Sequence, residues 1–131
     1  MPRRAARRPL SFDDVCRLAA DLPDVEVGTS YGTPALKVRG RSFCRLWGER
    51  EHRRDGVHDS EVLVVLGELP AKEVLLDAHP GVVFTTPHYD GYGAFLVRLA
   101  DVEAVDLADW LEDAYRLKAP ATLRRRLDGQ R

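Results

Sequence analysis

The sequence lacks several features that would assign it to a well-defined class. No apolar run approaches the roughly 18 residues that a membrane span needs. Only two cysteines are present, Cys16 and Cys44, and they form no CxxC pair. We interpret both as small buried apolar residues, with a disulfide framework or thiol catalysis as the alternatives. The fragments GYG and VRGR lack the glycine spacing of a P-loop or a dinucleotide fingerprint, so neither site is predicted.

Groups suited to catalysis are also scarce. His52 and His58 lie in one polar segment, but without a third histidine or an HExxH helix they do not predict a metal site. His88 and Asp90 share a loop and could serve acid–base chemistry or bind a ligand, yet no Ser or Cys nucleophile accompanies them in a recognisable motif. We therefore expect no metal, no cofactor and no enzymatic activity.

The size and the start of the chain favour one domain inside the cell. At 131 residues and 44% hydrophobic composition, the chain is long enough for one real core and too short for two. Residues 1–9 carry four arginines and no apolar h-region, so we expect no secretory signal. We expect a cytoplasmic protein that does not associate with membranes.

Charge is distributed unevenly along the chain. Of the 20 basic and 21 acidic residues, ten basic and one acidic lie within residues 1–9 and 116–131. The body between these ends is therefore acidic and repels phosphate as a whole. A nucleic-acid role would have to depend on local basic patches.

The pattern of apolar residues predicts an α+β fold. Helices are expected over 11–22 with Ser11 as N-cap, over 70–78, and from Asp106 as N-cap to just before Pro120. The run EVLVVL at 61–66 is apolar at five successive positions and predicts a strand covered on both faces, by the long loop, a terminus or a dimer partner. Residues 48–60 are polar and predict an exposed loop. The other predicted strands cover 35–39, 42–47, 82–84 and 94–99.

This order, α-β-β-β-α-β-β-α, predicts a two-layer sandwich: an antiparallel sheet with helices mainly on one face. We expect a single domain over residues 11–119, a disordered basic arm at 1–10 and a frayed basic tail at 120–131.

The chain is organised around a predicted basic β-hairpin. A turn-rich loop at 28–34 precedes two arms, 35–39 and 42–47, joined across Gly40 and Arg41. In this register Arg45 shares a face with Leu36 and Val38, so we expect a bulge that shifts it. The functional interpretation is a wing whose cations grip phosphate while an aromatic ring stacks on a base. The alternative is a solvated strand face whose arginines discourage edge pairing.

The ordered motifs of residues 11–127 resemble the MmcQ/YjbR-like proteins. The resemblance is carried by the segments LPDVE at 22–26, YGTP at 31–34, KVRGRSF at 37–43, TPHY at 86–89, VRL at 97–99 and DAYRL at 113–117. It implies a small α+β domain of the kind seen in secretion chaperones, and a DNA-binding role through a winged surface. The family's last strand often carries a tryptophan where this chain has Ala94 and Phe95, and its C-terminal lysines appear here as Arg124 and Arg125.

These observations give two functional hypotheses. The first is a small DNA-binding domain that uses the basic hairpin; the second is a protein-binding or homodimerising adaptor with no nucleic-acid role. For the first, the candidate residues are Tyr31, Lys37, Arg39, Arg41, Arg45, Trp47, His88, Tyr89, Arg124 and Arg125.

Overall fold

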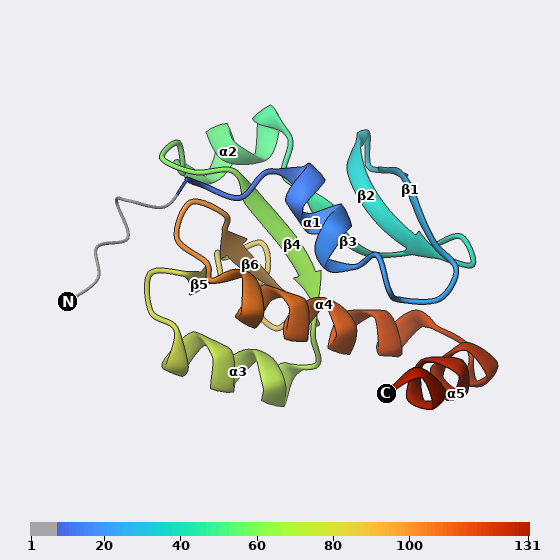
Figure 1. Cartoon of the computed structure of the whole chain (residues 1–131). Coiled ribbons are helices and arrows are strands. Elements are labelled where there is room, and N and C mark those ends of the chain that lie inside the picture. Colours follow the sequence, from blue (N-terminus) through green and yellow to red (C-terminus); the bar gives the residue numbers. More distant parts are fainter. Residues whose placement is uncertain (1–7) are drawn as a thin grey trace.

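A computed structural model describes residues 8–131, which form one six-stranded antiparallel sheet with strand order β1–β2–β3–β4–β6–β5 and five helices (Figure 1). The predicted α+β class is confirmed, with one strand and two helices more than expected. In chain order the elements are α1 (Phe12–Leu18), β1 (Val25–Ser30), β2 (Thr33–Val38), β3 (Arg41–Leu46), α2 (Glu49–Asp55), β4 (Val62–Leu66), α3 (Leu69–Ala78), β5 (Val83–Phe84), β6 (Ala94–Arg98), α4 (Ala104–Lys118) and α5 (Ala121–Gln130).

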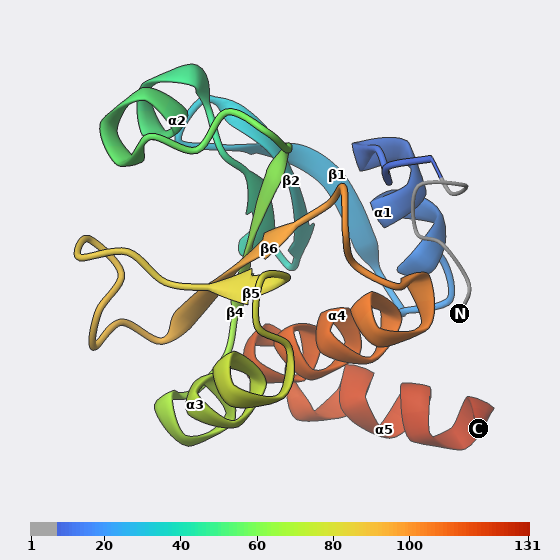
Figure 2. The same ribbon diagram turned by 90° about the vertical axis from the view of Figure 1, so that its left-hand side faces the viewer.

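The helices lie mainly on one face of the sheet, as predicted. Figure 2 shows α1, α3 and α4 on one side and α2 on the other. Helix α4 supplies the largest apolar stripe, and its Tyr115 packs edge-on against Phe43 of β3 and donates a 2.8 Å hydrogen bond to the carbonyl of Pro23. The helix begins two residues before Asp106, so the predicted N-cap is wrong.

Strand β4 is buried on both faces, which confirms the prediction from its unbroken apolar run. Leu63 and Val65 point into the main core beneath α4, whereas Val62 and Val64 belong to a second cluster with Trp47 and others. This second cluster is covered by α2 and by the loop at 85–93. The chain itself therefore supplies the covering for the far face around β4.

Two consecutive hairpins replace the single one predicted. Residues 25–30, expected to lead into and begin a loop, form β1, which pairs with β2 along its whole length. Both connections are two-residue turns with positive φ at each position: Tyr31 and Gly32 at 52° and 78°, then Arg39 and Gly40 at 50° and 78°. These are primed turns, which match strand twist. The β2–β3 turn therefore lies one residue earlier than predicted.

The predicted bulge is present in the second hairpin. Lys37 is opposite Ser42, but Leu36 is opposite Cys44, so one extra residue, Phe43, is accommodated between them. Phe43 is buried in the main core, and the shift brings Arg45 opposite Ala35. The bulge thus removes Arg45 from the apolar face and directs it to the other side of the sheet.

The polar segment at 48–60 is not only a loop, because its first half is helix α2. Glu51 reaches back to the backbone N–H of Gly48 at 2.8 Å, which satisfies a free donor at the helix start. Gly56 ends the helix in the left-handed conformation. Two features of the sequence could have predicted this helix. Glu51 lies three residues after the N-cap Gly48, as in a capping box, and Gly56 follows seven residues after the helix begins.

The prediction of a frayed C-terminal tail is also wrong. Residues 121–130 form α5, and its Leu123 and Leu127 are fully buried against the main core. Of the predicted basic arm, residues 1–7 lie outside the described residues. Residues 8–10 are fixed: the N–H of Leu10 donates to the carbonyl of Leu99, and Arg8 pairs with Asp14 at 2.6 Å.

Candidate binding groove

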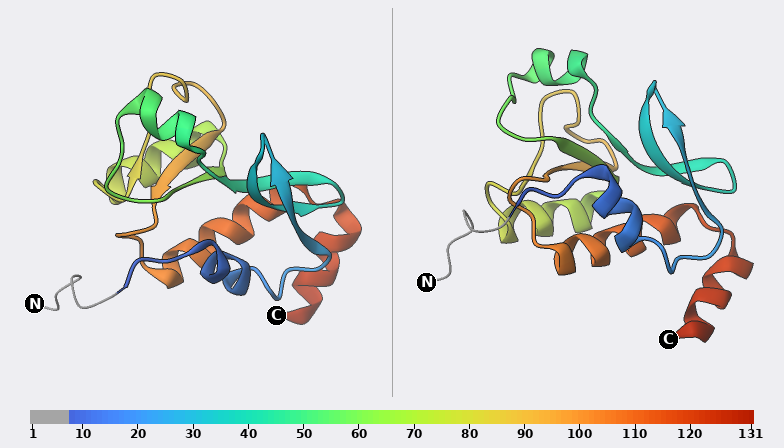
Figure 3. Two further views of the ribbon diagram at one scale, coloured as in Figure 1. Left: turned by 90° about the horizontal axis from the view of Figure 1, so that it is seen from above. Right: turned by 45° about the horizontal axis from the view of Figure 1, so that its top comes forward.

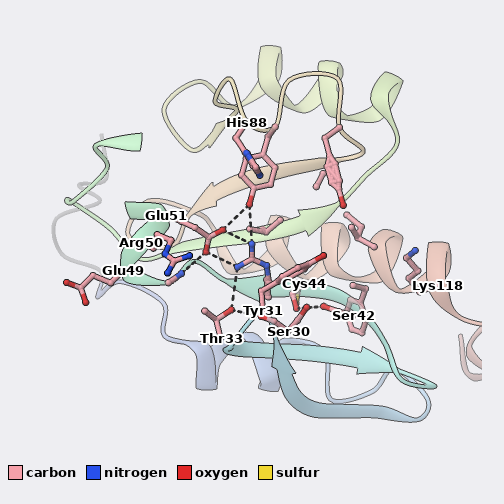
Figure 4. Close-up of a pocket in the computed structure, with 18 residues that line it drawn as sticks. Ser30, Tyr31, Thr33, Ser42, Cys44, Glu49, Arg50, Glu51, His88 and Lys118 are labelled. Atoms are coloured by element: carbon pink, nitrogen blue, oxygen red, sulfur yellow. Dashed lines mark hydrogen bonds and ion pairs between the residues drawn. The ribbon is translucent and has the colours of Figure 1, made fainter. Parts of the chain in front are cut away.

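A hollow of about 980 Å³ lies on the α2 side of the sheet and is called here the hairpin groove. The tip of the β1–β2 hairpin and α2 rise on the same side of the sheet (Figure 3). Val64, Leu66 and Ala94 contribute apolar surface, and the loop at 85–93 closes one side. The close-up in Figure 4 shows Glu49 and Arg50 at one end and Lys118 at the other. The lining residues with polar side chains are Ser30, Tyr31, Thr33, Ser42, Arg45, Glu49, Arg50, Glu51, His88, Tyr89, Tyr92 and Lys118.

The central group of the groove is an ion pair between Arg45 and Glu51. Two guanidinium nitrogens donate to the two carboxylate oxygens at 2.9 and 2.6 Å, and both side chains are about 85% buried, at 13% and 15% exposure. Burial acts against ionisation of Glu51, but hydrogen bonds from Arg45 and from the Gly48 N–H outweigh it and lower its pKa. The same pair raises the pKa of Arg45. Arg45 is therefore neutralised within the chain.

Tyr89 and Trp47 belong to this network and are not available for stacking. The Trp47 indole N–H and Arg45 both donate to the Tyr89 hydroxyl at 3.3 Å, and that hydroxyl donates to Glu51 at 3.3 Å. Trp47 is 3% exposed and Tyr89 is 4% exposed. The prediction that Trp47 offers its ring to a base is therefore wrong, and Tyr89 also has no free ring face. Both act as supports for the wall of the groove.

Tyr31 is the aromatic residue that the structure leaves open. Its side chain is 88% exposed at the tip of the β1–β2 hairpin, and the Arg45 guanidinium carbon lies 5.2 Å from its ring centroid. Tyr92, on the opposite side of the groove, is 52% exposed. Tyr31 is among the predicted site residues and Tyr92 is not, because the position of Tyr92 beside the groove depends on how the 85–93 loop folds back.

That loop is held by a buried lysine, which the sequence analysis also missed. Lys72 of α3 is 3% exposed, and its ammonium donates to the carbonyls of Tyr89 and Tyr92 at 2.6 and 3.0 Å. Burial lowers the pKa of Lys72, and the nearby Asp90 carboxylate opposes the shift. Because a charged donor to neutral carbonyls makes a strong hydrogen bond, Lys72 fixes the wall that carries Tyr92. His88, exposed on the same loop, stacks edge-on against Tyr89.

The hairpin cations differ in how free they are. Arg39 pairs with Asp24 at 3.0 Å, and Asp24 also contacts Arg126 at 3.5 Å. Within residues 8–131, no ion pair involves Lys37 or Arg41, although Lys37 lies opposite Glu26 in the β1–β2 ladder. The predicted set of four phosphate-binding cations on the hairpin is thus reduced to two.

The arginines of α5 are used largely within the chain. Arg124 donates to the carbonyl of Ala119 at 2.6 Å, at the end of α4, while Arg125 is exposed on the outer side of the helix. Neither lines the groove. The structure therefore does not bring Arg124 and Arg125 to the same site as Tyr31 and His88.

Cys44 and His52 lie in packed surroundings and do not belong to a metal-binding group within residues 8–131. Cys44 is buried among apolar side chains, and burial raises the pKa of its thiol to about 12. His52 bonds the carbonyl of Val57 through its ring Nδ1 and packs edge-on against Trp47. Residues 8–131 contain no group of three or more His, Cys, Asp or Glu that could hold a metal ion.

The fold and its order of elements are those of the YjbR family, and the family model, described as YjbR, matches residues 20–117. The chain belongs to this family. It is 35% identical over 127 residues to uncharacterised proteins of Mycobacterium tuberculosis and Mycobacterium bovis, covering 86% of this chain and 92% of theirs. A crystal structure of a Deinococcus radiodurans protein with a DUF419 domain has the same fold, with a TM-score of 0.65 at 21% identity over 90% of this chain and 88% of that one. None of the helices described here is both long and apolar enough to span a bilayer.

Proposed function

We propose that this protein is a non-catalytic binding module whose hairpin groove takes single-stranded DNA, with a base stacked on Tyr31. The observation that carries the proposal is the conformation and exposure of Tyr31. A bulky residue in the left-handed region costs about 1 kcal/mol or more, and glycine or asparagine would avoid most of that cost. Because the ring is almost fully exposed, burial does not compensate for the strain. A strained, exposed aromatic residue beside a groove is typical of a ligand contact.

The groove supplies the other elements of such a site. Arg45 lies against the Tyr31 ring, which orients the ring without using the charge for phosphate. Tyr92 offers a second partly open ring from the opposite wall. Stacking on two rings is tolerant of base identity, because every base presents a flat face.

Phosphate contacts would come from cations that no carboxylate neutralises. Arg50 and Lys118 line the groove at its two ends, and neither forms an ion pair within residues 8–131. Lys37 is opposite Ser42, another lining residue, whereas Arg41 is opposite Val38 of the main core and so lies on the other face of the strand. A few such contacts suit a single strand better than a duplex, since the body of the chain is acidic and would repel the second strand.

The proposal is tested by fluorescence anisotropy with a labelled oligothymidylate across a salt series. Tyr31→Gly should weaken binding about five- to 150-fold, the equivalent of about 1–3 kcal/mol of stacking. The same substitution should raise the urea midpoint, because glycine tolerates the positive φ. Opposite signs for affinity and stability exclude partial unfolding as the cause.

Matched variants define the remaining outcomes. Tyr31→Phe keeps the ring and should bind like the wild type, and Val105→Ala, on an exposed position of α4, should change nothing. Lys118→Ala should reduce the slope of log affinity against log salt by about 0.7, the value for one phosphate of a single strand. If the wild type shows no salt-sensitive binding at micromolar protein, or if Tyr31→Gly binds equally well, the proposal is refuted.

A further inference from the structure

A second pocket lies on the opposite side of the sheet, between α3 and α4, and is called here the α3–α4 pocket. It has a volume of about 300 Å³, and it opens where β4 ends and α3 begins. Its apolar lining comes from two strands of the sheet, β4 and β6, and from both helices. These lining residues are Leu66, Leu75, Phe95, Trp110 and Leu117.

The rim of this pocket carries only negative charge. Glu68 and Asp113 are the two charged lining residues, and no ion pair or side-chain hydrogen bond involves either carboxylate within residues 8–131. Burial raises the pKa of Asp113, with Glu112 and Asp109 on the same helix adding to the shift and Arg116 opposing it. An occupant of this pocket would therefore gain from bringing a cation to the rim.

Further apolar side chains of α3 and α4 are exposed to solvent. Leu117 at its edge is 42% exposed, and Leu69 and Val74 on α3 are 45% and 64% exposed. These side chains find no cover within the described chain, although the opposite face of the sheet is closed by α2 and the 85–93 loop. The pocket and these side chains together have the composition of a protein contact: an apolar centre and a charged rim.

We propose that the α3–α4 pocket docks a basic amphipathic segment of a partner protein. One apolar side chain enters the pocket against Trp110 and Phe95, and a Lys or Arg about one turn away meets Asp113 and Glu68. The negative rim favours a basic segment over an acidic one. An acidic segment with the same apolar residues would bring its carboxylates next to Glu68 and Asp113, and this repulsion would weaken binding. This interaction does not rest on the hairpin groove: the two pockets share Leu66, but Phe95, Trp110, Glu68 and Asp113 do not line the groove.

The test uses two labelled helical peptides with identical leucines, one carrying lysine and one carrying glutamate at every polar position. The lysine peptide should bind at least tenfold more tightly, and the indole N–H signal of Trp110 should shift on titration in a two-dimensional NMR spectrum. Ala71→Arg places a bulky cation on an exposed helical position that lines the pocket. It should abolish binding of the lysine peptide without lowering the urea midpoint.

Two further variants separate charge from packing and one pocket from the other. Asp113→Asn with Glu68→Gln should remove most of the preference for lysine over glutamate while keeping residual apolar binding. Tyr31→Gly, which disables the hairpin groove, should bind the lysine peptide as the wild type does. Equal affinity for both peptides, an unshifted Trp110 signal, or undiminished binding by Ala71→Arg would each overturn the inference.

Discussion

Removing the Glu51 carboxylate should destabilise the fold much more than a substitution in an exposed loop would. Glu51→Ala deletes the partner of Arg45, the cap on the Gly48 N–H and the acceptor of the Tyr89 hydroxyl. Breaking a fully buried ion pair costs about 3–5 kcal/mol. Because both side chains here retain some contact with water, we expect a loss of about 2–4 kcal/mol.

The measurement is urea unfolding of four proteins: the wild type, Glu51→Ala, Arg45→Met and the double variant. Because Arg45→Met removes the charge that Glu51→Ala would leave unpaired, the double variant should be more stable than the sum of the two losses implies, by about 1–3 kcal/mol. A loss of less than about 0.5 kcal/mol for Glu51→Ala, the range of ordinary surface substitutions, would show that α2 does not depend on this pair.

The same carboxylate gives the fold a pH dependence with a defined sign. Its pKa is lowered in the folded state, so its stabilising contribution is present above the unfolded pKa of about 4.3 and is lost as the pH falls through the lower folded value. The difference in unfolding free energy between the wild type and Glu51→Gln should therefore be constant near neutral pH and shrink below about pH 4. A difference that grows on acidification would contradict the assignment.

Two further substitutions test features that the sequence analysis did not foresee. Leu127→Ala should cost about 2–4 kcal/mol in urea unfolding, because its side chain is fully buried; a frayed tail would give almost no change. Lys72→Met should speed amide hydrogen exchange at 89–92 more than in β4, because the two carbonyls of the loop lose their charged donor. Equal acceleration in β4 would indicate general destabilisation instead.

The sequence predicted the fold where one strong local signal was enough. The unbroken apolar run of β4 predicted burial on both faces, and the awkward position of Arg45 predicted the bulge that moves it. Strand β1 was missed because glycine, threonine and serine read equally well as a loop, and only pairing with β2 makes them a strand. Helix α5 was missed because its two buried leucines are separated by three arginines, a pattern dominated by charge.

The candidate site was less predictable, since its properties arise from contacts far apart in sequence. Arg45 and Tyr89 are 44 residues apart, and their hydrogen bond decides that Tyr89 is a wall residue and not a stacking platform. From the sequence alone, every cation of the hairpin is equally available to bind phosphate. The carboxylates that neutralise Arg39 and Arg45 lie outside the hairpin, on the segments before β1 and after β3.

The C-terminal arginines show most clearly how the fold redistributes charge. Arg116 joins α4 to α5 through Glu112 and Asp128, and Arg131 reaches Asp21 and Glu112. A stretch that reads as a basic arm thus acts as a set of links between α5 and the acidic body. Since exposed pairs of this kind contribute little individually, their main effect is to cancel the local positive potential. Within residues 8–131, attraction for phosphate should therefore come mainly from the few unpaired cations near the hairpin groove, because Arg116 and Arg131 are already paired with carboxylates.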